Sequence, residues 1–150
     1  ADYSMKKQIM TVGKRIRAIR MFRTMTQKEL GEKLGYKSSP TIRIAQYESG
    51  KRSPHKEPIK AFAEALDVSF DAIDVAPIND STKLMHTLFA MEDFFDLKIK
   101  EVDHKAYLTF DSEELEKLLS EWLKMYNSYK NGDISEYEYK EWEYKFCKRK

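Results

Sequence analysis

Apolar residues recur at intervals of three and four through the first half of the chain, which is the spacing of one face of a helix. The first stripe, residues 9–19, predicts one helix. Thr26 then begins a second helix over 26–34, because Glu29 follows three residues later as in a capping box. Gly35 ends this helix, as a glycine just past the last turn usually does.

Further helices follow in the same half. Ser39-Pro40 supplies an N-cap residue and a proline at the first helical position, so we predict a helix over 40–48. A fourth helix begins at Pro58, and a short fifth helix or turn lies near 70–73. The first half is therefore predicted to be a bundle of short helices.

The second half has a different pattern. The helical spacing of apolar residues is lost at 76–80, and we interpret this segment as a linker between domains. Ser81 is predicted to cap a helix, after which the apolar period falls to two and predicts a β-hairpin with its turn at 103–105. Two helices, 112–130 and 135–147, complete the pattern. The predicted fold is mainly α, with a C-terminal helical region that contains one β-hairpin (α+β).

Charge divides the chain as clearly as hydrophobicity does. Residues 1–60 contain fifteen Lys or Arg and five Asp or Glu, a net charge of +10. Residues 61–75 and 76–150 each carry −4, which reduces the total to +2. The basic end therefore favours a polyanionic partner, and the acidic end a partner of another kind.

Composition and spacing argue against several classes of protein. Cys147 is the single cysteine, so no internal disulfide forms and a reducing compartment is favoured. No apolar run approaches the roughly 20 residues that span a bilayer, and the sequence shows no signal segment. It also shows no phosphate loop, nucleophile elbow or metal-ligand spacing. We expect a cytoplasmic protein that is not an enzyme and needs no metal or cofactor.

The helices 26–34 and 40–48, joined by a Gly-containing turn within the basic segment, have the arrangement of a helix-turn-helix DNA reader. The sequence reads TQKELGEKLG over 26–35 and IAQYESGKRSP over 44–54. Further apolar positions are Ile59, Phe62, Ala63, Leu66, Val68 and Ile73. With these features, residues 9–74 resemble the lambda-repressor/Cro-like helix-turn-helix family, also called the xenobiotic-response-element type. The resemblance implies a five-helix bundle whose third helix enters the major groove.

One helix face is predicted to read DNA. Ile44 and Tyr47 point inward, so the opposite face of helix 40–48 carries Ile42, Arg43 and Gln46. Arginine pairs with guanine and glutamine with adenine, while Ile42 either meets a thymine methyl group or fills a gap against helix 26–34. The predicted DNA-contact residues are Gln27, Lys37, Ser38, Ser39, Thr41, Ile42, Arg43, Gln46, Lys51 and Arg52.

These contacts rest on two further points. In the family, the residue at the position of Gln27 contacts a phosphate. The span from Gly35 to Gly50 is about two positions longer here than in the usual pattern, and the excess lies in the turn at 36–40, before the helix. The family contacts at the start of helix 40–48 therefore transfer less directly than those elsewhere. Glu48 is acidic amid the basic surface, so we predict that it forms an ion pair with Arg17 or Arg20 rather than a DNA contact.

The acidic end is rich in aromatic residues at helical spacing. A packed helical hairpin explains part of this pattern, and an interface explains the remainder, because Trp and Tyr are enriched at interfaces. The predicted dimer or partner residues are Trp122, Tyr126, Tyr129, Tyr139, Trp142 and Phe146. We keep sensing of a protein partner or a small effector as a further role of this region.

The sequence is divided accordingly. Residues 1–8 are a flexible N-terminus or a cloning remnant, 9–75 the DNA-binding domain, 76–80 the linker and 81–150 the dimerisation or partner domain. The leading hypothesis is a transcription repressor of a bacterium or one of its mobile elements. It would bind double-stranded DNA as a homodimer at a near-palindromic operator. The alternatives are an antitoxin that also binds a toxin through the C-terminal region, and an adaptor without a DNA role.

Overall fold

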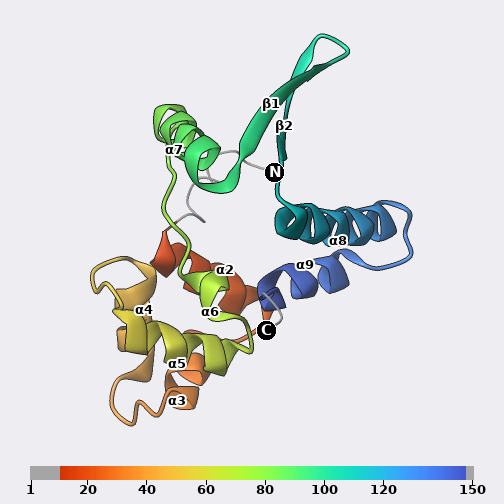
Figure 1. Cartoon of the computed structure of the whole chain (residues 1–150). Helices are drawn as coiled ribbons and strands as arrows, with labels where there is room; N and C mark the ends of the chain where they lie inside the picture. The colour runs from red at the N-terminus through yellow and green to blue at the C-terminus, as the bar shows by residue number, and fades with distance from the viewer. Residues whose placement is uncertain (1–10, 148–150) are drawn as a thin grey trace. The chain divides into compact units, whose positions relative to one another are not determined.

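The chain folds into two compact units, which are described separately (Figure 1). A computed structural model describes residues 11–147. The first unit comprises Ala1–Pro77 and Glu141–Lys150, and the second comprises Ile78–Lys140. The predicted flexible segment 1–8 lies outside the described residues.

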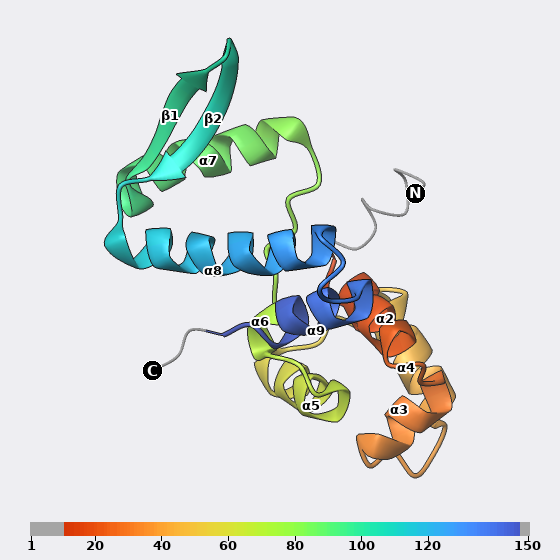
Figure 2. The same ribbon diagram turned by 90° about the vertical axis from the view of Figure 1, so that its right-hand side faces the viewer.

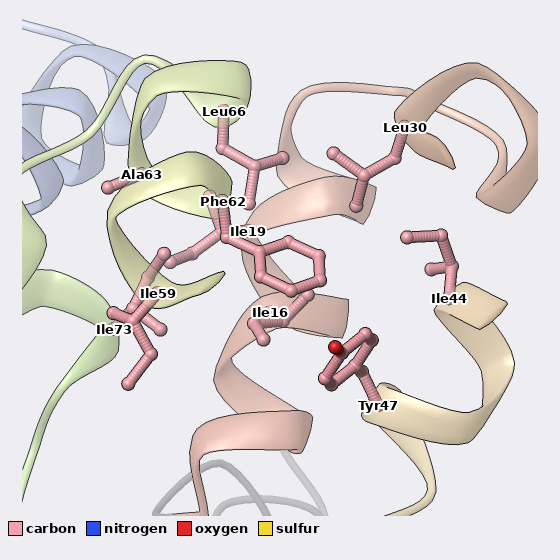
Figure 3. Packing of buried hydrophobic residues seen from close by; sticks show 10 residues of the cluster. All are labelled: Ile16, Ile19, Leu30, Ile44, Tyr47, Ile59, Phe62, Ala63, Leu66 and Ile73. Carbon is pink, nitrogen blue, oxygen red and sulfur yellow. The ribbon is translucent and has the colours of Figure 1, made fainter. Parts of the chain in front are cut away.

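Five helices lie in the described part of the first 77 residues, as the sequence pattern predicts. Phe62 is fully buried at the centre of their common core, and its ring meets that of Tyr47 edge-on at 5.2 Å (Figure 3). The least exposed large side chains of the core are Phe62, Ile16, Ile19, Leu30, Ile44, Leu66 and Ile73. The helices are α2 (Val12–Phe22), α3 (Gln27–Lys33), α4 (Pro40–Glu48), α5 (Lys56–Leu66) and α6 (Phe70–Ile73).

Local capping sets where these helices begin. The predicted capping box at α3 is present: the Glu29 N–H donates to the Thr26 hydroxyl at 3.1 Å, and the Thr26 N–H donates to the Glu29 carboxylate at 2.6 Å. The bond from the Thr26 backbone lowers the pKa of Glu29. Ser39 is the N-cap residue of α4 and Pro40 its first helical residue, as predicted, but Ser39 has a left-handed backbone (φ 50°) and its side chain makes no capping bond.

The last helix also contributes to the first unit. In α9 (Glu136–Lys145), the ring of Tyr144 meets Phe22 edge-on at 5.2 Å, and its carbonyl accepts the Ser69 N–H at 3.0 Å. Glu141 forms an ion pair with Arg23. The sequence division had assigned residues 81–150 to one module, whereas the structure groups Glu141–Lys150 with the bundle because of such contacts.

Arg23 links this helix end to the end of α5. Its guanidinium donates to the carbonyls of Leu66 and Asp67, both at 2.8 Å, and also to Glu141. Lys145 adds a 2.9 Å ion pair to Asp67. The last carbonyls of a helix have no partner within it and carry partial negative charge, so these cations stabilise the end of α5.

The second unit begins with α7 (Ser81–Phe95), which packs against β1 (Leu97–Val102). The N-cap of α7 is Asp80, whose carboxylate accepts the Lys83 N–H at 2.8 Å, so the prediction of Ser81 as the cap was one residue too late. Asp80 and Ser81 are both good capping residues, and the one that accepts a free N–H of the first turn sets where the helix begins.

The predicted β-hairpin is present. β1 pairs antiparallel with β2 (Lys105–Phe110) in the register Leu97 to Phe110. The two turn residues, Asp103 and His104, have φ of 51° and 63°, as tight two-residue hairpin turns require. Lys105, which the sequence had placed in the turn, is the first residue of β2.

Helix α8 (Glu113–Lys130) and the start of α9 form a helical hairpin around Tyr139. The Tyr139 ring stacks on Tyr129 with centroids 5.1 Å apart, and its hydroxyl accepts the Trp122 indole N–H at 2.7 Å. Tyr139 is therefore a core residue of this hairpin rather than a side chain left free for a partner.

Candidate nucleic-acid interface

Helices α3 and α4 lie in close contact because of a glycine. A Cβ atom on Gly31 would lie 2.6 Å from the Cβ of Pro40, a distance that real Cβ atoms do not show. Any larger residue at position 31 would therefore push the two helices apart. The Gly31 carbonyl also accepts the N–H of Tyr36 at 3.0 Å, which ties the intervening turn to α3.

Helix α4 has a buried face and an exposed face. Ile44 and Tyr47 are 0% and 7% exposed, whereas Ile42 is 59% exposed. Thr41 and Arg43 beside Ile42 are also exposed. The alternative in which Ile42 fills a gap against α3 is therefore not supported, because an isoleucine in such a gap would be buried.

The longer turn contributes Tyr36, a residue that the sequence reasoning did not select. The guanidinium of Arg43 lies over the Tyr36 ring, 4.9 Å from its centroid, in a cation–π contact. Tyr36 is partly buried, and this burial raises the pKa of its hydroxyl, with a further contribution from Tyr47. Tyr36 thus holds Arg43 at the exposed edge of α4.

The ion pair predicted for Glu48 is formed with Arg20. The Arg20 Nε lies 2.5 Å from Glu48 Oε1, and Arg20 Nη2 donates to Oε2 at 3.2 Å. Glu48 is 4% exposed, so its charge is buried together with its partner. The second residue on Glu48 was not foreseen: Gln27 Nε2 donates to Oε2 at 2.9 Å. This bond fixes the Gln27 side chain at the first residue of α3.

The other predicted contact residues lie on the two turns and on α4. Lys37, Ser38 and Ser39 are exposed in the turn before α4. Lys51 and Arg52 are exposed after it, and the Arg52 guanidinium lies 5.7 Å from the Tyr47 ring centroid. Gln46 is half-buried, and its backbone carbonyl accepts the Arg52 N–H at 3.0 Å. All ten predicted residues thus belong to α3, α4 and the adjoining turns.

Helices α3 and α4 are closely packed, and α4 has one face exposed to solvent. This arrangement within a helical bundle is that of a helix-turn-helix domain. A family model described as helix-turn-helix matches residues 16–73. The matched segment, 58 of the 150 residues, agrees with the resemblance to lambda repressor/Cro-like helix-turn-helix domains and supports a role in DNA binding and transcription regulation in general. The curated proteins and the solved structures that were compared contain no match to the chain.

The remaining predicted site residues form two groups. In the second unit, Trp122 and Tyr126 are 49% and 42% exposed. In the first unit, Phe146 is 36% exposed, and its ring lies 5.5 Å from that of the half-buried Trp142. The structure therefore does not gather the six predicted aromatic interface residues on one unit.

No set of three His, Cys, Asp or Glu side chains is arranged to hold a metal ion in the described part of the chain. Within residues 11–147, none of the helices combines the length and apolar character needed to cross a membrane.

Proposed function

We propose that this protein is a transcription repressor that binds a near-palindromic operator as a homodimer, with α4 in the major groove. The observation that carries the proposal is the exposed isoleucine on α4. Ile42 is 59% exposed beside Arg43, on a helix whose other face is buried. An apolar side chain on this solvent face is favourable once it contacts a thymine methyl group.

Each residue of the exposed face has a role in this proposal. Arg43 donates two hydrogen bonds to a guanine, and Gln46 forms a bidentate pair with an adenine. Thr41 and Ile42 contact the neighbouring bases. The cation–π contact with Tyr36 supports this assignment of Arg43, because a held guanidinium loses less side-chain entropy on binding than a free one.

The DNA backbone is held by residues on both sides of α4. Lys51 and Arg52 contact phosphates after the helix, and Lys37, Ser38 and Ser39 do so before it. Gln27 contacts a phosphate from the first residue of α3, and its bond to Glu48 keeps the amide in place for that contact. Phosphate contacts position the protein without reading the sequence.

The proposal is tested by selecting bound sequences from a random DNA pool at a stated salt concentration. We expect a near-palindrome with half-sites about one helical turn, roughly 34 Å, apart. A non-palindromic site would contradict the dimer, and the absence of any retained DNA at low salt would contradict the DNA-binding role.

Variants of single residues, measured on the selected operator, distinguish the residues that contact bases from those that contact phosphates. Arg43→Ala should weaken binding by about 1–3 kcal/mol and relax the preference at one base pair. Lys51→Ala should weaken binding to all sequences alike and lower the salt slope by about 0.9. Lys60→Ala is the control, because it removes one exposed charge from α5, outside the predicted contact set. Unchanged operator binding by the Arg43→Ala/Gln46→Ala double variant would show that α4 is not the reading helix.

The repressor role requires only that the protein occupies its operator. A protein bound at an operator that overlaps a promoter blocks the access of RNA polymerase. A reporter gene behind the selected operator should be silenced by the chain and restored by the Arg43→Ala/Gln46→Ala variant. Increased expression would indicate an activator. The antitoxin alternative predicts that a second, toxic protein co-purifies from the native host, whereas a repressor acting alone predicts only the homodimer.

A further inference from the structure

Helix α7 is far more exposed than its composition suggests. Of its fifteen residues only Lys83, Glu92 and Asp93 are formally charged at pH 7, yet the helix contains no buried residue. Its exposed apolar side chains are Leu84 (44%), Met85 (45%), Phe89 (49%), Phe94 (80%) and Phe95 (43%). Helices that are apolar around most of their circumference are normally covered by other parts of the protein.

The β1–β2 ribbon has one apolar face and one basic face. Its register pairs Ile99 with Leu108 on the first face and Lys100 with Tyr107 on the second. The first face carries Leu97, Ile99, Glu101, Ala106, Leu108 and Phe110, and the second carries Lys98, Lys100, Val102, Lys105, Tyr107 and Thr109. Three lysines thus lie on one side of the ribbon, and most of its aliphatic residues lie on the other.

The apolar face of the ribbon is covered only at one end. Leu97, at the α7 end, is 4% exposed, whereas Ile99 and Leu108 further along are 69% and 50% exposed. Figure 2 shows the ribbon tip extending away from α7. A two-stranded hairpin is marginally stable in water by itself and needs cover for its apolar face.

We propose that the exposed apolar residues of α7 other than Phe94, together with those of the apolar ribbon face, form a surface that binds the same surface of a second copy of the chain; we name it the α7–ribbon face. The inference rests on the proposed dimeric function and deepens it by assigning the surface. The α7–ribbon face is defined by Leu84, Met85, Phe89, Phe95, Ile99 and Leu108.

Charge selects this face for symmetric pairing. A two-fold dimer brings the same patch of both copies together, so any charge in the patch meets its own kind. On the basic side of the ribbon, Lys98, Lys100 and Lys105 would repel their counterparts. The apolar side carries one charged residue, Glu101, which lies toward the turn and is exposed. The apolar side is therefore the one that can meet its own copy.

The exposed area also suits a homodimer. Each of the two phenylalanines has a surface of roughly 150–250 Å² and each of the four other side chains somewhat less, so the six at about half exposure present on the order of 500 Å². A standard interface buries about 800 Å² per partner, and the centre of a homodimer interface is rich in apolar residues. The α7–ribbon face thus supplies most of the surface that a stable dimer needs.

Two adjacent residues provide a matched test. Leu108 and Tyr107 are 50% and 52% exposed but point to opposite faces of the ribbon. We expect the unmodified chain and Tyr107→Glu to be dimers by sedimentation equilibrium without DNA. Leu108→Glu should dimerise at least about 30-fold more weakly, the effect of losing an interface hot spot of about 2 kcal/mol. A monomeric unmodified chain, or equal dimerisation by both variants, would overturn the assignment.

A second measurement avoids the introduced charge. In a Cys147→Ser background, the thiol of Leu108→Cys should react more slowly with a maleimide as the protein concentration rises through the dimerisation range. The thiol of Tyr107→Cys should react at a constant rate. Equal behaviour of the two thiols would contradict the α7–ribbon face, even if Leu108→Glu fails to fold.

The outcomes separate this inference from the proposed function. Leu108→Glu should still bind DNA non-specifically at low salt, because its contact residues are intact. A dimer that forms through another surface would refute the α7–ribbon face while leaving the dimeric repressor standing. A dimer that binds no DNA would refute the proposed function while leaving the interface standing.

Discussion

The two units of this chain use their apolar residues in opposite ways. The first packs seven large side chains, Phe62 among them, to less than 2% exposure. Among the described residues of the second unit, only Leu97 and Tyr139 are buried hydrophobics. Since burial of an apolar side chain contributes about 1.5–3 kcal/mol, the first unit gains far more from its core than the second does. The comparison supports the proposal that another surface covers the second unit.

The units also differ in how they use charge. In the first, the Arg20 and Glu48 side chains are 11% and 5% exposed and form a hydrogen-bonded pair. In the second, ion pairs such as Lys117 with Glu113 are exposed, at 76% and 88%. Exposed ion pairs contribute little to the free energy of unfolding. Charged side chains therefore form part of the packed interior in the first unit, whereas in the second they mainly favour solubility.

The largest expected effect is a core truncation. Phe62→Ala should lower the free energy of unfolding of the first unit by about 3–5 kcal/mol, because it removes a fully buried ring and leaves a cavity. Urea denaturation measures the loss. Phe94→Ala, at 80% exposure in the second unit, should change the free energy of unfolding by less than about 0.5 kcal/mol. Equal losses in the two variants would remove the contrast between the units.

Breaking the buried ion pair should cost somewhat less. Glu48→Ala leaves the Arg20 charge with its bond to the Met25 carbonyl at 2.7 Å, so we expect a loss near the lower end of the usual range, about 3 kcal/mol. Thermal denaturation of Glu48→Ala, Arg20→Ala and the double variant gives the coupling between them. Additive losses would mean that the two side chains do not interact, contrary to the structure.

A smaller effect is expected inside the helical hairpin of the second unit. Tyr139→Phe removes the acceptor of the Trp122 indole N–H and should lower the stability of this unit by about 1 kcal/mol. Tyr107→Phe, at 52% exposure, serves as the control and should have almost no effect. Fluorescence of Trp122 during urea denaturation follows this hairpin, provided that Trp142→Phe removes the other indole. No difference between the two variants would contradict the hydrogen bond.

The smallest effect depends on pH. The bond from Arg23 lowers the pKa of Glu141 in the folded state, so this group stabilises the fold above its unfolded pKa of about 4.3. That stability is lost as the pH falls through the lower folded pKa. Glu141→Gln should therefore lower the free energy of unfolding at pH 6 by less than about 1 kcal/mol, seen as a lower Tm, and this difference should shrink as the pH falls below about 4.3. Glu64→Gln is an exposed control in the same unit, and an equal pH response of both variants would contradict the assignment.

Several features of the fold and the site could be read from neighbouring residues. The capping box of Thr26 and Glu29 and the hairpin turn at Asp103 were predicted because the interactions that form them span only a few positions. The cap of α7 was misplaced by one residue, because Asp80 and Ser81 are both good capping residues and only the backbone geometry chooses between them. Local sequence therefore predicts the elements better than their first residues.

Other features depend on contacts between distant parts of the chain. Arg17 and Arg20 were equal candidates for Glu48, and the packing of α2 on α4 selects Arg20. The contact of Arg43 with Tyr36 arises from a turn with no periodic pattern. The pairing of Arg23 with Glu141 joins residues 118 positions apart, which no local rule predicts.

Hydrophobic period, capping and charge are local properties, so the amino-acid sequence was enough to predict the elements, the basic and acidic halves and the helix that faces solvent. Packing between distant residues sets which aromatic residues of the acidic half are core and which are exposed. It assigns Tyr139 to the helical hairpin and groups the end of α9 with the bundle. Helical spacing shows that side chains share a face, but only the packed neighbours determine whether that face is covered.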